Sequence, residues 1–182
     1  IMCGIIGIQN NSEAATLAYM GLYAQQHRGQ EGAGVVSSDG TVLHRHMGQG
    51  LVSDVFSDSA VFDSLIGDSA IGHVRYSTTG NSDPKNVGPL TFNMGDYSLS
   101  IAHNGNLVNL DEIRKELQEN GALFQTSTDT EIIIHLLARE KGKTLADKLE
   151  KVLQKIEGAY SLILLSPSEI IAARDPHGIR PF

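Results

Sequence analysis

Apolar residues near the amino-terminal end change from a strand-like run to a helical spacing within the first 26 positions. Ile5, Ile6 and Ile8 predict a short strand. An alanine- and leucine-rich stretch begins after Ser12 and predicts a helix that continues to about Gln26. The chain therefore opens with a predicted strand followed by a predicted helix.

Glycine and turn-forming residues dominate the next segment. Residues 27–34 predict a glycine-rich loop. Asp39 and Gly40 stand between apolar residues and predict the turn of a β-hairpin. Residues 71–76 and 99–103 predict two further strands, and in the second apolar residues alternate with small or polar ones.

The second half of the chain carries three predicted helices. Each begins at a residue of capping type with an acidic residue three positions later, namely Asn109, Thr128 and Thr144. Residues 159–165 and 169–173 predict two strands joined by a Ser-Pro-Ser turn. Strands, then helices, then strands do not form a regular alternation, so the pattern predicts an α+β layered fold rather than a doubly wound sheet.

Composition narrows the class of protein. The chain has 182 residues, 41% of them hydrophobic and 19% charged, as in a single globular domain. Its net charge is −7 and no basic run stands out, which disfavours nucleic acid as a partner. No apolar run approaches the ~20 residues of a membrane span and no signal peptide is recognisable. We therefore expect a cytoplasmic protein with no membrane partner.

The single cysteine, Cys3, is the strongest candidate for chemistry, although a lone cysteine is often only a small buried apolar residue. If Ile1 and Met2 are removed, Cys3 carries both a thiol and a free α-amine, whose reference pKa is about 7.7–8.0. Nucleophile and general base then belong to one residue, as in N-terminal nucleophiles.

Three polar segments hold further candidates, each with a plain structural alternative. Asn104 and Gly105 offer two donors for a developing oxyanion, or form only a turn. Arg75 can hold a carboxylate in a bidentate fork, or lies at the surface. Asp129 can bind an ammonium group, or only stabilises the first turn of a helix.

The seven histidines do not predict a metal site. His44 and His46 share a strand face without a third ligand and are predicted to be surface residues, whereas His135 is predicted to pack on an apolar helix face. The zinc-protease, P-loop and dinucleotide motifs do not occur in the sequence. We therefore expect neither a metal nor a cofactor in these 182 residues.

Six motifs follow one another in an order typical of one enzyme family. They are CGIIGI at 3–8, HRGQEGAG at 27–34, GHVRYST at 72–78, HNGN at 103–106, TDTE at 128–131 and ARDPHGIRP at 173–181. Together they resemble the glutaminase domain of the class II, N-terminal-nucleophile glutamine amidotransferases across essentially the whole chain. The second, third and sixth motifs are most similar to the members of purine biosynthesis that make 5-phosphoribosylamine.

The resemblance implies a four-layer αββα fold, with two stacked antiparallel sheets between helix layers. It implies Cys3 as the nucleophile, its own α-amine as the base, and an oxyanion hole formed by Asn104 and Gly105. Glutamine is the implied substrate, with its α-carboxylate on Arg75 and its α-ammonium on Asp129. The other implied substrate-binding residues are Tyr76, Ser77, Arg28 and Gly29.

The resemblance also implies a larger enzyme. We expect residues 1–182 to form one glutaminase domain that continues past Phe182 into a homo-oligomeric chain with a phosphoribosyltransferase domain. Mg²⁺ and an iron–sulfur cluster are expected only with that missing domain. Two alternatives stay open: the glutaminase domain of another class II enzyme, such as a glucosamine-phosphate synthase, and a catalytically silent regulatory module with a blocked amino terminus.

Overall fold

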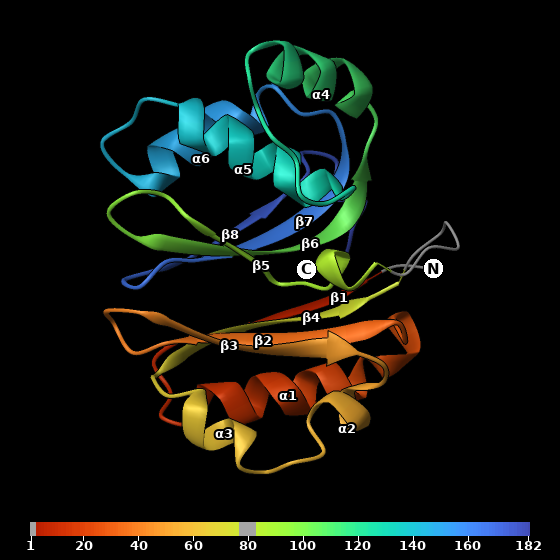
Figure 1. Cartoon of the computed structure of the whole chain (residues 1–182), viewed down its shortest axis with the longest axis vertical. Coiled ribbons are helices and arrows are strands. Elements are labelled where there is room, and N and C mark those ends of the chain that lie inside the picture. The colour runs from red at the N-terminus through yellow and green to blue at the C-terminus, as the bar shows by residue number, and fades with distance from the viewer. Residues whose placement is uncertain (1–2, 77–82) are drawn as a thin grey trace.

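Two four-stranded antiparallel sheets lie face to face between outer layers of helices in the computed structural model, which describes residues 3–76 and 83–182 (Figure 1). The expected four-layer αββα architecture is therefore confirmed. Within the described residues, no helix is long and apolar enough to cross a membrane.

The first sheet brings the amino-terminal end beside the third motif. Its strands, in spatial order, are β1 (Gly4–Ile8), β4 (Ser69–Arg75), β2 (Gly32–Ser38) and β3 (Leu43–Gln49). Gly4 lies opposite Val74 in the antiparallel pair of β1 and β4, and Gly32 lies opposite Arg75. Cys3, directly before β1, therefore lies at the carboxyl end of β4.

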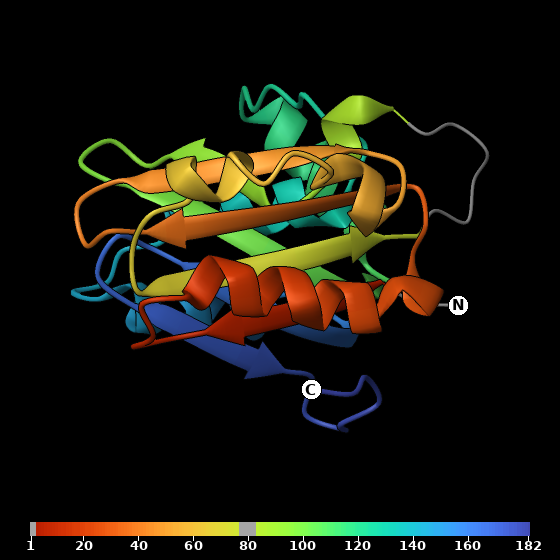
Figure 2. The ribbon, with the colours of Figure 1, turned by 90° about the horizontal axis from the view of Figure 1, so that it is seen from below.

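Helices cover the outer face of the first sheet (Figure 2). α1 (Ala14–Ala24) packs Leu22 and its buried alanines on the sheet, beside the shorter α2 (Val52–Val55) and α3 (Val61–Ser64). Gly72 of β4 makes room for this packing, because a Cβ atom there would lie 2.9 Å from the Cδ1 atom of Leu22.

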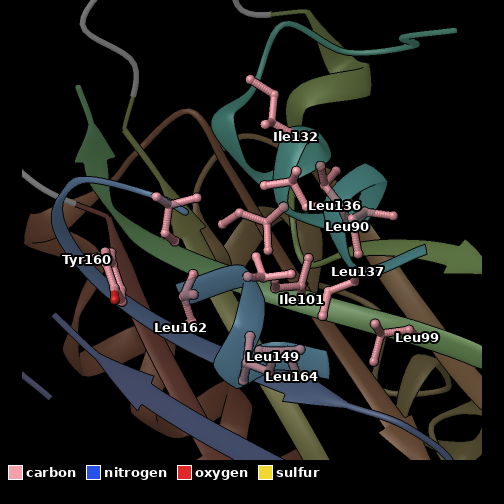
Figure 3. Packing of buried hydrophobic residues seen from close by; sticks show 14 of the residues in the cluster. Leu90, Leu99, Ile101, Ile132, Leu136, Leu137, Leu149, Tyr160, Leu162 and Leu164 are labelled. Carbon is pink, nitrogen blue, oxygen red and sulfur yellow. The ribbon is translucent and has the colours of Figure 1, made fainter. Parts of the chain in front are cut away.

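The second sheet carries the larger apolar core. Its order is β5 (Leu90–Asn93), β6 (Ser98–Leu107), β7 (Gly158–Leu165) and β8 (Ile170–Arg174), and its helices are α4 (Leu110–Glu119), α5 (Asp129–Arg139) and α6 (Leu145–Leu153). Figure 3 shows apolar side chains of α5 gathered over those of β6 and β7, among them Leu137, Ile101 and Leu162. Burial of each such side chain stabilises the fold by about 1.5–3 kcal/mol.

A smaller apolar layer lies between the sheets and fixes how β4 faces β6. Its buried members are Val36, Ile71, Ala102, Ile163 and Leu165. At the edge of this layer, the Nε2 atom of His73 on β4 donates to the main-chain carbonyl of His103 on β6 at 3.2 Å.

Two segments expected to be loop or turn lie partly in strands. Residues 27–34 were expected to be a loop, but after the 3₁₀ helix η1 (Gln26–Arg28) the chain enters β2 at Gly32, because β3 and β4 pair with it on both sides. The HNGN motif lies inside β6 rather than at a strand end, because its main chain stays paired with β7, Asn104 opposite Ser161 and Gly105 opposite Tyr160.

The predicted helix caps have different outcomes. Thr144 and Asp147 form the expected capping box at the start of α6. Thr128 makes no side-chain cap bond, because Glu131 instead accepts from the main-chain N–H groups of Gln125 at 2.8 Å and Thr126 at 2.6 Å. The capping-box prediction for α5 was therefore wrong.

Candidate active site

A cavity of about 210 Å³ opens where β4, β6 and the start of α5 meet. Pockets for drug-sized ligands are about 300–1,000 Å³, so this cavity suits a smaller molecule. Polar side chains dominate its wall. The lining residues are Cys3, His73, Arg75, Tyr76, Asn86, Gly88, Leu90, Ile101, His103, Gly105, Asn106, Ser127, Thr128, Asp129 and Thr130.

The Cys3 thiol is held by the main chain at the end of β4. The Tyr76 N–H donates to the sulfur at 3.5 Å, and the thiol lies 3.7 Å from the Tyr76 carbonyl oxygen. Arg28 fixes the main chain of the same residue, since its Nε atom donates to the Cys3 carbonyl at 3.1 Å. The sulfur is therefore fixed at the wall of the cavity before any ligand binds.

The surroundings of Cys3 favour its thiolate. Burial raises the pKa of the thiol, but the charge and hydrogen bond of His73, the Tyr76 N–H and the charge of Arg75 together lower the pKa to about 7. Because a carbonyl only accepts, the His73 Nε2 atom that faces the His103 carbonyl carries a proton. A substantial fraction of Cys3 is therefore ionised at neutral pH.

Asn104 lies on the main-chain side of the nucleophile. In the orientation that satisfies both ends of its amide, the nitrogen donates to the Cys3 carbonyl at 3.1 Å and the oxygen accepts from Arg28 Nη2 at 3.2 Å. The side chain lines a neighbouring cavity of about 350 Å³ together with Arg28. The NH₂ group has a second hydrogen besides the one that it donates to the Cys3 carbonyl. The use of this hydrogen in an oxyanion hole stays a prediction.

Two glycines allow close approaches of main chain around the cavity. A Cβ atom on Gly105 would lie 2.2 Å from the carbonyl oxygen of Ala159, so no larger residue fits there. A Cβ atom on Gly29 would lie 2.5 Å from the carbonyl oxygen of Arg75. Gly29 thus packs behind Arg75, and its predicted contact with substrate stays a prediction.

Two opposite charges, those of Arg75 and Asp129, line the same cavity. An Nη1 atom of Arg75 donates to the carbonyl of Asn86 at 3.1 Å, while the Asp129 carboxylate accepts from the Leu107 N–H at 3.3 Å. Burial raises the pKa of Asp129, against the lowering effects of the Leu107 N–H and the charges of Arg114 and Arg75. An ammonium ligand would compensate this partly buried carboxylate.

The sequence and the fold were compared with known proteins. A family model described as a glutamine amidotransferase domain matches residues 73–182. The chloroplastic amidophosphoribosyltransferase 2 of Arabidopsis thaliana is 49% identical over 180 residues, which are 98% of this chain and 32% of the relative. The amidophosphoribosyltransferase of Lacticaseibacillus casei is 42% identical over 179 residues, 98% of this chain and 92% of the relative.

The chain belongs to the amidophosphoribosyltransferase family. A solved structure described as the allosteric regulatory enzyme of purine biosynthesis agrees, with a TM-score of 0.93 and 43% sequence identity over 100% of this chain and 38% of that one. The chain spans about a third of the length of the Arabidopsis amidophosphoribosyltransferase. The match therefore covers the glutamine amidotransferase domain of the family.

The structure brings most of the predicted site residues of this amidophosphoribosyltransferase-family domain to one place. Cys3, Arg75, Tyr76, Gly105 and Asp129 line the cavity. Asn104, Arg28 and Gly29 lie behind the main chain of Cys3 or Arg75. Ser77 lies outside the described residues. Within the described residues, no group of three or more His, Cys, Asp or Glu side chains could hold a metal ion.

Sequence reasoning assigned no role in this site to His73, His103 or Asn86. His73 stands two residues before Arg75 on one strand, and this alternation could have placed both on the cavity face. His103 is buried, which together with the charges of His73 and Arg180 lowers its pKa to about 3 and keeps its ring neutral. Asn86 has no local signal, because its contacts are distant along the chain.

Replacement of His73 by glutamine should raise the pKa of Cys3 toward the ordinary ~8.5 of a cysteine. The neutral side chain removes the charge that lowers this pKa, so thiolate forms only at higher pH. At pH 7 the rate of iodoacetamide alkylation should fall roughly tenfold, with the midpoint of its pH profile moved upward. His46→Gln is the matched control, since His46 also bonds a main-chain carbonyl. An unmoved midpoint in His73→Gln would contradict the assignment.

Proposed function

We propose that this chain is the glutaminase part of an amidophosphoribosyltransferase, hydrolysing the side-chain amide of glutamine to glutamate and ammonia. One observation carries the proposal: a cysteine whose pKa is lowered to about 7 shares a small cavity with an arginine and a partly buried aspartate. Free glutamine offers one carboxylate and one ammonium group, which match Arg75 and Asp129. A peptide chain has both groups tied up in amide bonds.

Binding at its two α-groups orients glutamine with the side-chain amide toward Cys3. The thiolate attacks the amide carbon, and a tetrahedral oxyanion forms within reach of Asn104 and Gly105 as donors. The protonated α-amine of a trimmed Cys3 then gives its proton to the departing nitrogen. The C–N bond breaks, ammonia leaves, and a γ-glutamyl thioester remains on the sulfur.

Water completes the turnover. The neutral α-amine takes a proton from a water molecule, which attacks the thioester carbon. The C–S bond breaks, glutamate leaves, and the sulfur and the amine return to their starting state. In the complete enzyme, a phosphoribosyltransferase domain would use the ammonia to make 5-phosphoribosylamine for purine biosynthesis. The names of the Arabidopsis and Lacticaseibacillus relatives support this second step.

Three expectations about the complete protein remain part of the proposal. Mg²⁺ and an iron–sulfur cluster would belong to the phosphoribosyltransferase domain, and the complete enzyme would be a homo-oligomer. A cytoplasmic location also stays a prediction, since the Arabidopsis relative is chloroplastic by name.

A diazoketone analogue of glutamine tests the proposal. It should alkylate Cys3 alone, because the two α-groups bring its reactive carbon to the sulfur. Peptide mass mapping locates the label, and excess glutamine should slow the reaction. Glutaric acid monoamide, which lacks the α-ammonium group that Asp129 would bind, is the matched competitor and should protect much less. Labelling elsewhere, or labelling that glutamine does not slow, would overturn the proposal.

A further inference from the structure

Asn86 joins two segments that are far apart in the sequence and adjacent at the cavity. It is the last residue of the 3₁₀ helix η2 (Pro84–Asn86) and is only 4% exposed. It lines the cavity without belonging to any of the six motifs. A buried polar side chain must find hydrogen-bond partners, and those of Asn86 lie on both sides of the site.

The main chain of Asn86 holds the arginine. Its carbonyl oxygen accepts from Arg75 Nη1 at 3.1 Å. This contact fixes one arm of the guanidinium group, while its Nε atom lies 3.9 Å from the Glu31 carboxylate. The side chain of Asn86 turns the other way, toward the segment that precedes α5.

The side chain of Asn86 makes two bonds to one residue. Its Nδ2 atom donates to the Ser127 hydroxyl at 3.1 Å, and its Oδ1 atom accepts from the Ser127 N–H at 3.3 Å. Two bonds to one partner fix orientation as well as distance. Ser127 stands two residues before Asp129, so this pair also sets where α5 begins.

The same segment is anchored from the opposite side. Glu131, 1% exposed, accepts from the N–H groups of Gln125 and Thr126 and from the Thr126 hydroxyl. The Leu107 N–H holds the Asp129 carboxylate. Glu131 and Leu107 thus hold this segment on one side. Asn86 connects it to Arg75 on the other side.

We propose that Asn86 is a positioning residue that sets the spacing between the Arg75 guanidinium and the Asp129 carboxylate. It thereby selects ligands whose carboxylate and ammonium groups sit on one carbon atom. The inference rests on the proposed function, because that function places the α-groups of glutamine on Arg75 and Asp129. Asn86 acts through these two residues and not on the reacting atoms.

Loss of the Asn86 side chain is expected to change KM for glutamine rather than kcat. The two α-groups do not change during the reaction, so a spacing error weakens ground state and transition state alike. Asn86→Ala, made in the full chain, should therefore raise KM for glutamine about 10- to 100-fold and change kcat much less. A general loosening of the fold would instead lower the fraction of active protein and hence kcat.

Two reagents for Cys3 make the test independent of turnover. The diazoketone analogue carries both α-groups, whereas iodoacetamide carries neither. Asn86→Ala should slow labelling by the analogue about tenfold or more and leave alkylation by iodoacetamide unchanged. Asn109→Ala is the matched control, because Asn109 also bridges two segments, by bonds to Lys155 and Glu157 away from the cavity. It should change neither rate.

The two labelling rates either support the role of Asn86 or overturn it. Equal slowing of both reagents, or no slowing of either, would overturn the role of Asn86. If Asn86→Ala does not fold, Ser127→Ala removes one of the same two bonds and should shift the ratio of the two rates in the same direction; an unchanged ratio there would overturn the role too. If the unsubstituted chain reacts with iodoacetamide but not with the analogue, the proposed function fails, and the inference fails with it.

Discussion

Replacement of Cys3 by alanine should abolish glutamine hydrolysis, with a loss of about 10⁴-fold or more, as expected when a covalent nucleophile is removed. No other cysteine occurs in the chain, so no second thiol can substitute. Ammonia release from glutamine, followed with a coupled dehydrogenase assay, measures the effect. The oriented binding site contributes little without an attacking group.

The same variant should still bind glutamine. Arg75 and Asp129 keep their own partners, Asn86 and Leu107, and neither contact involves Cys3. Calorimetric titration should therefore give a dissociation constant near that of the unsubstituted protein, and thermal unfolding should show an intact fold. A Cys3→Ala protein that keeps more than a few per cent of the hydrolysis rate would exclude Cys3 as the nucleophile.

Freeing the α-amine of Cys3 should have the second-largest effect. While Ile1 and Met2 remain attached, the nitrogen of Cys3 is an amide and cannot accept a proton. Loss of a general base costs about 10²- to 10⁴-fold, so the untrimmed chain should be slower by that factor. The test compares two preparations, one beginning at Ile1 and one at Cys3, with the intact mass recorded for each.

The pH dependence and a control separate the base from the nucleophile. The α-amine gives a proton to the leaving nitrogen and then takes one from water, so hydrolysis by the trimmed chain should have a bell-shaped pH profile. It should rise as the Cys3 thiol ionises near pH 7 and fall as the α-ammonium group loses its proton above about 7.7–8.0. Alkylation by iodoacetamide should stay measurable in the untrimmed chain, because His73, Tyr76 and Arg75 lower the pKa of the thiol without the α-amine. Equal hydrolysis by both preparations would contradict the assignment of the base.

Local sequence signals predicted regular elements well where tertiary contacts agree with them. Thr144 and Thr128 carry the same local signal for a capping box, since both stand three residues before an acidic residue. Thr144 forms the capping box with Asp147, but Glu131 is buried and satisfies the turn before α5 instead. Spacing alone does not distinguish the two cases, because the difference lies in burial.

The HNGN motif was misplaced for a related reason. An Asn-Gly pair favours a turn in isolation. Here β6 continues through Gly105, because pairing with β7 brings the Ala159 carbonyl to a position that only a glycine tolerates. The short α2, α3 and β5 had no prediction, since four residues are too few to show a period.

The residues of the candidate site also differ in whether the sequence predicts them. Cys3, Arg75 and Asp129 were found from the order of the motifs and the chemistry of their side chains, and the fold places them at one cavity. His73 and Asn86 act through contacts with the other sheet and with Ser127, 41 positions away. Such contacts leave no local pattern in the sequence.

The most direct test of the account is to find the covalent intermediate. The trimmed chain is mixed with glutamine, quenched in acid within one turnover and examined by mass spectrometry. We expect a single added γ-glutamyl group on the Cys3 peptide, which hydroxylamine removes as expected for a thioester. An active chain that carries the γ-glutamyl group on another residue would contradict Cys3 as the nucleophile. So would an active chain in which no γ-glutamyl group is found on Cys3 even when turnover is slowed.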